Sequence, residues 1–317
     1  MGEVVVAGEA LIDLVVGAGG RVDAHPGGGP FNAARTMARL GIPTAFLGRL
    51  AGDGFGRLLR ERLAADGVGI AVAEPSGRPS TLAVVSLDDA GVASYSFYLD
   101  GTSVADLDYA AARRALPAAA TAVHVGSLGL LMEPAGTSTE RLLADVPPGT
   151  LVLLDPNCRP GAVADHDAYR ERVGVFARRA DIVKASVEDL AYLCPGVPPA
   201  EAAATLLAAG PSLVLVTDGP HPARAFLPGA VLAEPAPAVQ VADTIGAGDA
   251  FGGGFLAWWT AHGLRREDLG DAELVGGALR AAVAVAALTC ARPGADPPHL
   301  AELLARNWWP ESRRPRT

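Results

Sequence analysis

Short apolar runs alternate with stretches of helical hydrophobic spacing along most of this 317-residue chain. The apolar runs end in Gly, Pro or polar residues, as buried strands do, and they lie at residues 4–8, 44–48, 121–125, 151–154, 181–184 and 213–217. Helical spacing is clearest at residues 33–40, 250–259 and 274–289. This alternation predicts an α/β fold with a mostly parallel central sheet.

The alternation breaks between residues 79 and 99, where two β-rich runs follow each other directly. Residues 81–87 and 92–98 flank Asp88-Asp89-Ala90-Gly91, a sequence typical of a hairpin turn. Two strands outside the βα alternation predict a small accessory sheet, and an ordinary edge hairpin is the alternative. An accessory sheet over a reaction site would exclude water from it.

The chain is long enough for one large α/β domain or two smaller ones. We see no internal repeat and no interdomain linker, so we expect a single domain over residues 1–317. Half of the residues are hydrophobic and 19% are charged, as in globular proteins. No run of about 18 apolar residues is free of Gly, Pro and charge, and the start lacks the features of a signal peptide. We therefore expect a cytoplasmic protein without a membrane span.

Charge and cysteine content narrow the possible chemistry. The formal net charge is −9 and no basic stripe is visible, so we expect no binding of nucleic acid. Lys184 is the only lysine and does not follow a glycine, so no Walker-type loop is present. Cys158, Cys194 and Cys290 show no Cys-x-x-Cys spacing, which favours a reducing compartment over a disulfide framework or a zinc site.

The most informative stretch is Asp-Thr-Ile-Gly-Ala-Gly-Asp-Ala-Phe at residues 243–251. Its Gly246-Ala247-Gly248 turn precedes a predicted helix, and the free amides at a helix N-terminus form a ready anion site. Asp249 lies at the mouth of this turn, where a carboxylate is well placed to accept a proton from an attacking hydroxyl. The alternative is a first-turn acid that only complements the helix dipole.

A second candidate site lies near the start of the chain. Asp13 follows the first predicted strand closely, at the edge of the sheet where ligands gather in open parallel sheets. Gly28 and Gly29 permit close backbone approach, and Asn32 in the next helical turn can both donate and accept hydrogen bonds. An exposed loop acid and a structural Gly-rich loop are the alternatives.

Together these segments resemble the two signatures of the ribokinase-like (PfkB) family of carbohydrate kinases. Residues 243–251 match its C-terminal signature, and residues 27–34 match Gly-Gly-x-x-x-Asn-x-Ala of its N-terminal signature. The resemblance implies a three-layer sandwich with a mostly parallel central sheet and a small β lid, with lid strands from about residues 13–25 and 79–99. It implies ATP and Mg²⁺ as cofactors, a sugar hydroxyl as phosphoryl acceptor, and a homodimer formed through the lid.

The resemblance also assigns roles to individual residues. Asp249 corresponds to the catalytic base, and the amides of Gly246, Ala247 and Gly248 correspond to the anion hole for the γ-phosphate. Residues 155–159 match the family pattern Asp-x-Asn-x-Arg in an active-site loop. The residues implied in sugar binding are Asp13, Gly28, Gly29, Asn32, Phe97 and Arg159.

On the nucleotide side the resemblance is less complete. The residues implied in ATP binding are Lys184, Ser186, Thr217, Gly219, Gly246, Gly248 and Gly294. The family pattern places Glu three residues after Asn or Ser, whereas this chain has Asp189 there with Glu188 beside it, so either acid could serve the metal-bound phosphates. A helix capped by Ser186 explains the same residues without a metal. Carbonyl oxygens of Asp243 and Ile245 are the implied ligands of a possible K⁺ site.

The clearest departure from the family follows residues 217–219, where Pro220-His221-Pro222 replaces a segment with a further glycine. Proline lacks an N–H and fixes φ, so this loop cannot bind phosphate by the same backbone path. We expect weaker ATP affinity or an unusual loop shape.

Within the family, residues 8–13, 27–32 and 155–159 look most similar to the fructokinase branch. A 2-keto-3-deoxygluconate kinase typically has Tyr-Arg in the lid where this chain has Tyr98-Leu99, so we expect a neutral sugar, with a ribose or nucleoside kinase also open. A nucleotide-cofactor oxidoreductase needs Gly-x-Gly-x-x-Gly after the first strand, which is absent. The rival of another class is a non-catalytic sugar-binding protein, supported only by the proline-containing loop.

Overall fold

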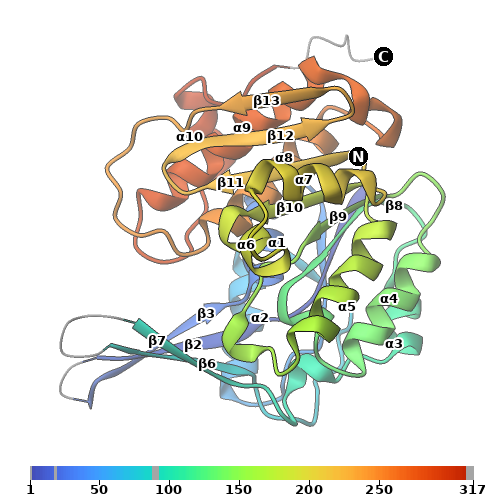
Figure 1. Cartoon of the computed structure of the whole chain (residues 1–317). Coiled ribbons are helices and arrows are strands. Elements are labelled where there is room, and N and C mark those ends of the chain that lie inside the picture. Colours follow the sequence, from blue (N-terminus) through green and yellow to red (C-terminus); the bar gives the residue numbers. More distant parts are fainter. Residues whose placement is uncertain (1, 18–19, 88–92, 312–317) are drawn as a thin grey trace.

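The computed structural model describes residues 2–17, 20–87 and 93–311, and its centre is a large mixed sheet (Figure 1). In spatial order the strands are β13 (Ala230–Glu234), β12 (His221–Leu227), β11 (Leu213–Asp218), β10 (Ile182–Ser186), β9 (Leu151–Asp155), β8 (Ala120–Gly126), β1 (Glu3–Ala7), β4 (Thr44–Leu47) and β5 (Gly69–Ile70). Strands β11 through β5 in this order are parallel, and β12 and β13 form an antiparallel edge. All the predicted strands of the main sheet are confirmed.

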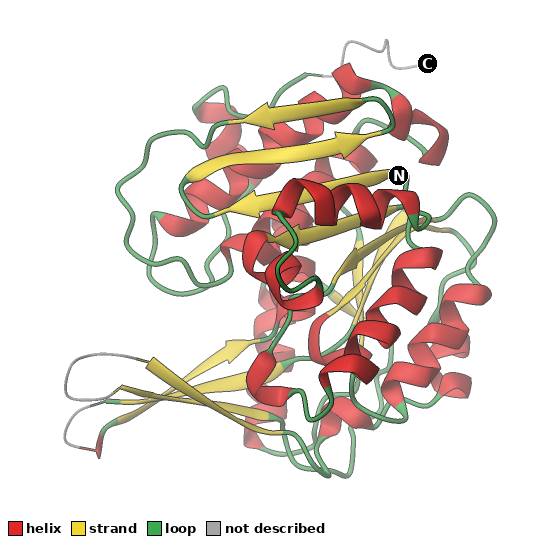
Figure 2. Cartoon of the chain, viewed as in Figure 1, coloured by secondary structure: helices red, strands yellow, loops and turns green. Residues whose placement is uncertain are grey.

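Helices cover both faces of this sheet, as Figure 2 shows. One face packs against α1 (Gly29–Arg39), α2 (Gly54–Ala65), α8 (Ala247–Ala261), α9 (Ala272–Cys290) and α10 (Leu300–Ala305). The other face packs against α3 (Tyr109–Ala115), α4 (Ala135–Ala144), α5 (His166–Arg179), α6 (Val187–Leu193) and α7 (Pro199–Ala208). Short 3₁₀ helices lie at η2 (Ser103–Ala105), η3 (Ser127–Leu130), η4 (Pro160–Ala162) and η5 (Arg266–Gly270). The predicted three-layer α/β sandwich is confirmed.

Strand β1 shows why the strand sequences are continuously apolar. Val4 and Val6 point into the core on the α8 face, while Val5 and Ala7 point into the core on the α5 face. Because successive side chains alternate between faces, a strand covered on both sides needs apolar residues at every position.

Helix α9 is long and apolar enough to cross a membrane by length and composition alone. Its most apolar window is 78% buried inside the molecule, where α9 packs along α8. That burial is typical of a core helix.

A second, four-stranded sheet projects from the sandwich at the lower left of Figure 1. Its spatial order is β3 (Val22–Gly27), β2 (Leu11–Val16), β6 (Leu82–Leu87) and β7 (Ala93–Tyr98). Strand β2 pairs antiparallel with β3 and parallel with β6, which pairs antiparallel with β7. The predicted accessory sheet is thus confirmed, although the turn at residues 88–91 lies outside the described residues. We call these four strands the lid.

Candidate active site

The site lies at the carboxyl-terminal edge of the large sheet, beside neighbouring strands β1, β8 and β9. After β1 the chain enters the lid and α1 and returns on one side as β4, while β8 lies on the other side. Such a topological switch point leaves a crevice beyond the strand ends, which is the usual ligand site of open α/β sheets. The start of α8 borders this edge, because Asp249 contacts side chains from α1 and from the loop after β9.

The predicted anion turn has the backbone that its glycines permit. Gly246 caps α8 with φ of 75°, in the left-handed region. A Cβ built on Gly246 would lie 2.6 Å from Ala295 Cβ, so a side chain there meets a clash as well as strain. The amide of Ala247 donates to the Thr244 carbonyl, whereas a helix offers no internal acceptor to its next amides, those of Gly248 and Asp249. Those amides suit an anion.

Asp249 is 8% exposed and is held by two amide side chains. Asn32 Nδ2 donates to its Oδ2 at 2.9 Å, and Asn157 Nδ2 donates to its Oδ1 at 3.2 Å. Burial raises the pKa of Asp249, while the Asn32 hydrogen bond and the charges of Lys184 and Arg159 oppose that rise. The carboxylate is therefore fixed in orientation and biased toward accepting a proton.

Asn32 also carries a buried polar atom at the edge of the site. Its side chain is 6% exposed, and its Oδ1 has no hydrogen-bond partner among the described residues. Buried polar atoms are nearly always paired, so an unpaired one at a site edge suits a donor from the ligand, such as a sugar hydroxyl.

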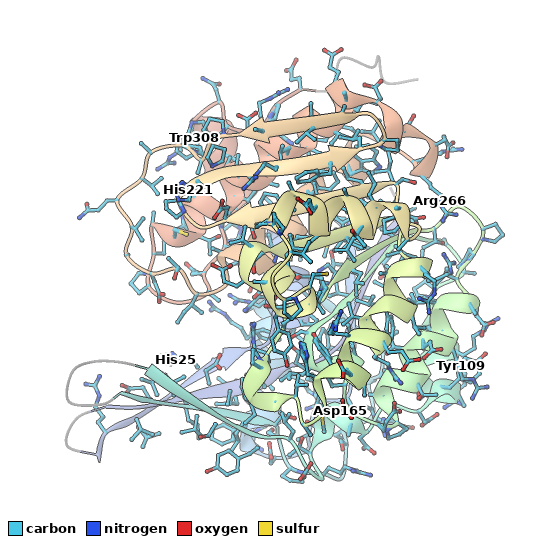
Figure 3. The ribbon with its side chains drawn as sticks, viewed as in Figure 1. His25, Tyr109, Asp165, His221, Arg266 and Trp308 are labelled. Atoms are coloured by element: carbon cyan, nitrogen blue, oxygen red, sulfur yellow. The ribbon has the colours of Figure 1, made fainter. Side chains whose placement is uncertain are left out.

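Asp13 reaches the same site from the lid. It lies in β2 opposite His25 of β3 (labelled in Figure 3), and its carboxylate lies over Gly27, where an added Cβ would be 2.1 Å from Oδ2. Burial raises the pKa of Asp13 to about 6, Arg159 opposes the rise, and Asp249 adds to it. The charges of Arg159 and Asp249 therefore act on the Asp13 carboxylate, and a shared role of the three residues in sugar binding stays a prediction.

Gly28 and Gly29 are required by close contacts. Gly28 has φ of 109°, and a Cβ on it would lie 2.8 Å from the Glu9 carbonyl oxygen. A Cβ on Gly29 would lie 2.6 Å from Asn157 Nδ2 and 3.2 Å from Asp249 Oδ1. The glycines therefore let α1 begin directly against the Asp249 carboxylate.

Two residues at the site were not among the predicted site residues. Glu9 is buried, and its carboxylate accepts hydrogen bonds from the amides of Gly29 at 3.2 Å and Gly129 at 3.0 Å. Asn157, part of the predicted active-site loop but without a predicted contact, has φ of 43° and donates a hydrogen bond to Asp249. The position of Glu9 in the sequence indicates such a role, because a charged residue directly after a buried strand rarely lacks a partner.

The remaining residues predicted to bind sugar are Phe97, where the lid meets the sandwich, and Arg159, which lies near Asp249. Phe97 of β7 is partly buried and packs on a small cluster that includes Leu11 and Leu128. Arg159 is partly buried beside Cys158, with Nη1 donating to the Cys158 carbonyl, and its charge acts on Asp13 and Asp249.

The Ser186 segment forms the helix cap that we weighed as an alternative. Ser186 Oγ accepts from the Asp189 amide, and Asp189 Oδ2 accepts from the Ser186 amide at 2.8 Å, which makes a capping box for α6. Asp189 Oδ1 accepts from the Cys158 amide at 2.7 Å. Both carboxylate oxygens of Asp189 thus accept hydrogen bonds from backbone amides. Of the two acids, Glu188 is therefore the one more available for a contact with metal-bound phosphates. No group of three or more His, Cys, Asp or Glu side chains able to hold a metal was found among the described residues.

The proline-containing segment is a tight hairpin turn. Asp218 at the end of β11 pairs with His221 at the start of β12 (labelled in Figure 3), leaving Gly219 and Pro220 as the turn. Gly219 has φ of 52°, as the first position of a primed hairpin turn requires, and proline suits a following position with negative φ. The unusual sequence therefore forms an ordinary two-residue turn, and weaker ATP affinity stays a prediction.

Asp243 ties the segment before α8 to the loop after α9. Its Oδ1 accepts from the Ile245 amide at 3.0 Å, and its Oδ2 accepts from the Gly294 amide at 2.8 Å. These bonds bring together three residues predicted on the nucleotide and cation side.

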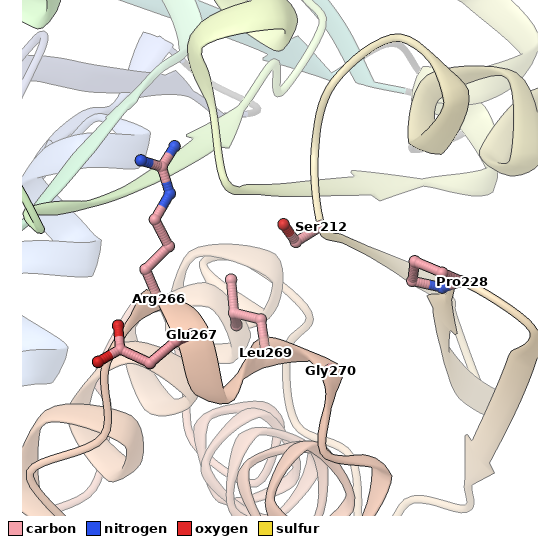
Figure 4. A pocket seen from close by; sticks show the side chains of 6 residues that line it. All are labelled: Ser212, Pro228, Arg266, Glu267, Leu269 and Gly270. Atoms are coloured by element: carbon pink, nitrogen blue, oxygen red, sulfur yellow. The ribbon is translucent and has the colours of Figure 1, made fainter.

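One surface pocket lies away from this site. It has a volume of about 420 Å³ and is lined by Ser212, Pro228, Arg266, Glu267, Leu269 and Gly270 (Figure 4). Ser212 immediately precedes β11, so the pocket lies at the opposite edge of the sheet from Asp249.

Comparison with known proteins identifies the family. The model of the pfkB family of carbohydrate kinases matches residues 1–301. A fructokinase of Rhizobium leguminosarum bv. trifolii is 36% identical over 264 residues, covering 80% of this chain and 78% of that protein. The crystal structure of Xylella fastidiosa fructokinase with bound ATP has a TM-score of 0.88 and 30% identity, covering 96% of this chain and 97% of that chain.

A fructokinase from Vibrio cholerae, a double mutant crystallised with fructose, ADP and potassium ion, has a TM-score of 0.82 and 28% identity, covering 96% and 98% of the two chains. Sequence motifs, site geometry and whole-chain similarity agree. The chain belongs to the PfkB family of carbohydrate kinases.

Proposed function

We propose that this protein is an ATP-dependent fructokinase. The observation that carries the proposal is the position of Asp249, a buried carboxylate held by Asn32 and Asn157 in the first turn of α8. A base that is fixed beside unpaired helix amides suits transfer of a phosphoryl group to a hydroxyl.

In the proposed reaction Asp249 accepts the proton of the sugar hydroxyl as its oxygen attacks the γ-phosphorus. The new O–P bond forms while the bond from the γ-phosphorus to the bridging oxygen of ADP breaks. ATP supplies the phosphoryl group, and a bound Mg²⁺ would supply positive charge that offsets the charge of its phosphates. We propose that the turn formed by Gly246, Ala247 and Gly248 faces the transferring group, where preorganised donors are worth most. The Gly248 amide is its chief donor, because the expected Ala247 amide already donates to the Thr244 carbonyl.

The sugar would lie between the lid and α1. The Asp13 carboxylate would accept hydrogen bonds from two sugar hydroxyls, and the unpaired Oδ1 of Asn32 would accept one from another hydroxyl. Gly28 and Gly29 let the sugar approach the backbone, while Phe97 and Arg159 border the site. Arg159 already balances Asp13 and Asp249, which favours a neutral sugar over a sugar acid.

On the nucleotide side we propose ATP contacts from Thr217, Gly219 and Gly294 along the loops that flank the anion turn. The cation would be held mainly through the phosphates and water, because Mg²⁺ takes few direct protein ligands in such sites. Glu188 is the better candidate than Asp189 for an indirect contact. We propose the carbonyl oxygens of Asp243 and Ile245 as ligands of K⁺. The potassium ion bound in the similar Vibrio cholerae fructokinase supports this proposal.

We also propose a cytoplasmic homodimer formed through the lid. Val22 and Tyr98 on the lid strands are 53% and 59% exposed. Light scattering tests this part, because a monomer at micromolar concentration would contradict it.

The substrate is tested by ADP release with Mg-ATP and a panel of fructose, ribose, 2-keto-3-deoxygluconate, tagatose phosphate and adenosine. Turnover on fructose alone supports the proposal. Turnover on another member would keep the mechanism and change the substrate. Sugar binding without turnover on any member would favour the non-catalytic alternative.

A further inference from the structure

Three buried ionisable side chains lie side by side beneath the anion turn. His124, Asp155 and Lys184 come from neighbouring strands β8, β9 and β10 and are each at most 3% exposed. Their strand neighbours Val123, Val125, Leu154, Val183 and Ala185 all point into the core on the α5 face. Alternation therefore points these three side chains to the opposite face, toward α8.

Lys184 contacts both Asp155 and the turn. Its ammonium lies 3.0 Å from Asp155 Oδ2. A Cβ built on Gly248 would lie 2.9 Å from Lys184 Nζ, so the ammonium is packed against the backbone of the second residue of α8. Lys184 thus fills the space directly under the anion turn, whereas a direct ATP contact was expected from the sequence.

The charges around this ammonium are mostly negative. Asp155, Asp189 and Asp249 all act on Lys184, and Asp249 in turn feels Lys184 and Arg159. Asp13 is a further carboxylate on the lid side of Asp249. Asp155 Oδ1 has no partner among the described residues, so removing Lys184 would leave a buried carboxylate with no hydrogen bond.

His124 cannot replace the lysine as a cation. Neither ring nitrogen has a hydrogen-bond partner among the described residues, and burial together with the charge of Lys184 lowers its pKa to about 3. It is therefore neutral at the pH of the cell, and Lys184 supplies the positive charge on this side of Asp249.

We infer that Lys184, held by Asp155, is a positioning residue that supports the Gly246-Ala247-Gly248 turn from beneath and lends positive charge to Asp249. This inference rests on the proposed function, in which Asp249 is the base. It replaces a direct ATP contact of Lys184 with an action through the backbone and the base.

The test follows the ionisation of Asp249 in three proteins: the parent chain, Lys184→Met and Asp155→Asn. Protein labelled with ¹³C at the aspartate carboxyls is titrated by NMR, and the Asp249 signal is the one missing in Asp249→Asn. Losing the cation should raise the pKa of Asp249 by roughly one or more, and losing the anion should lower it. The acid limb of the pH profile of kcat/KM should move to higher pH in Lys184→Met and to lower pH in Asp155→Asn. The kcat of Lys184→Met should be at least about tenfold lower than that of the parent.

A double variant, Lys184→Met with Asp155→Leu, guards against misfolding, since it removes both charges and leaves neither unpaired. It should fold and keep a reduced kcat. Equal Asp249 titration in Lys184→Met and the parent, or full kcat in the double variant, would overturn the inference. Failure of the proposed function looks different: the parent would release no ADP on any sugar, while the NMR titration would still report on Lys184.

Discussion

Asn32 donates a 2.9 Å hydrogen bond to Asp249 across a separation of 217 residues. The bond joins the first turn of α1, which follows directly from the lid, to the first turn of α8. The helix that we propose to contact the sugar and the helix that carries the proposed base are therefore fixed to each other. Neither helix alone contains a complete site.

Asn32→Ala should lower kcat/KM by about 10- to 100-fold, because a hydrogen bond to a charged group is worth roughly 1.5–3 kcal/mol. Since the bond favours the ionised carboxylate, its loss should also move the acid limb of the pH–rate profile to higher pH. Steady-state ADP release from pH 5 to 8 measures both effects. Thr36→Val, one turn along the same helix, is the matched control and should retain the parent profile.

Gly246→Ala should lower turnover by roughly 10²–10³-fold, since the added methyl displaces the turn that we propose as the binding site of the transferring phosphoryl group. The control is Gly263→Ala just beyond the other end of α8, where φ is 65° and no atom lies within 4 Å of the new Cβ. Both changes strain a left-handed residue by about 1–2 kcal/mol. Thermal melts should therefore show a loss for both variants, while only Gly246→Ala loses activity; equal activities would contradict the role of the turn.

The sequence predicts most of the fold because its signals are local. Strands such as β1 are apolar on both faces, and Ser186 is recognisable as a helix cap from its place before the acids of the first turn. The parallel pairing of β2 with β6 has no local signal, because it depends on how the chain crosses between two segments about 70 residues apart. Only the assembled lid shows that Asp13 lies in a strand opposite His25.

The candidate site, like the fold, is predictable from the sequence where its signals are local. The turn before Asp249 is written in consecutive residues, so its backbone follows from its glycines. Glu9 and Asn157 become part of the site through contacts with α1, η3 and α8, which exist only after the strand ends converge. The paired burial of Lys184 and Asp155 on adjacent strands likewise requires the strand order.

Variants of Asp189 and Glu188 should distinguish a structural role from a role in nucleotide binding. Asp189→Ala removes the carboxylate that accepts from the amides of Ser186 and Cys158, so the free energy of unfolding should fall by roughly 2 kcal/mol or more. Glu188→Gln should leave stability unchanged and raise the Mg-ATP concentration needed for half-maximal rate. Urea unfolding and ATP titration measure the two effects, and a stable, ATP-defective Asp189→Ala would reverse the assignment.

Sugar binding should depend on pH through Asp13, whose pKa is raised to about 6 mainly by burial. The ionised carboxylate accepts hydroxyl hydrogen bonds, so fructose should bind more weakly as the pH falls through 6. The effect on stability has the opposite direction: the folded state holds this proton more tightly than the unfolded chain. Asp13 therefore stabilises the fold below about pH 4 and loses that contribution as the pH rises to 6.

Calorimetric titration with fructose and urea unfolding, each between pH 4.5 and 8, measure these two dependences. Asp13→Asn should bind fructose poorly at every pH and lose this part of the stability change. A fructose affinity that is constant across pH 6 would contradict a binding role for the ionised Asp13.

The most direct test of the account compares the parent chain with Asp249→Asn in ADP release with Mg-ATP, with and without fructose. Asparagine keeps the shape of the side chain but cannot take the hydroxyl proton, and general-base catalysis contributes typically 10²–10⁴-fold. Calorimetry with fructose shows whether the variant retains its sugar site. We expect fructose-dependent turnover in the parent, at least a 10²-fold loss in Asp249→Asn, and sugar binding in both. Turnover that survives in Asp249→Asn, or that proceeds equally without sugar, would contradict the account.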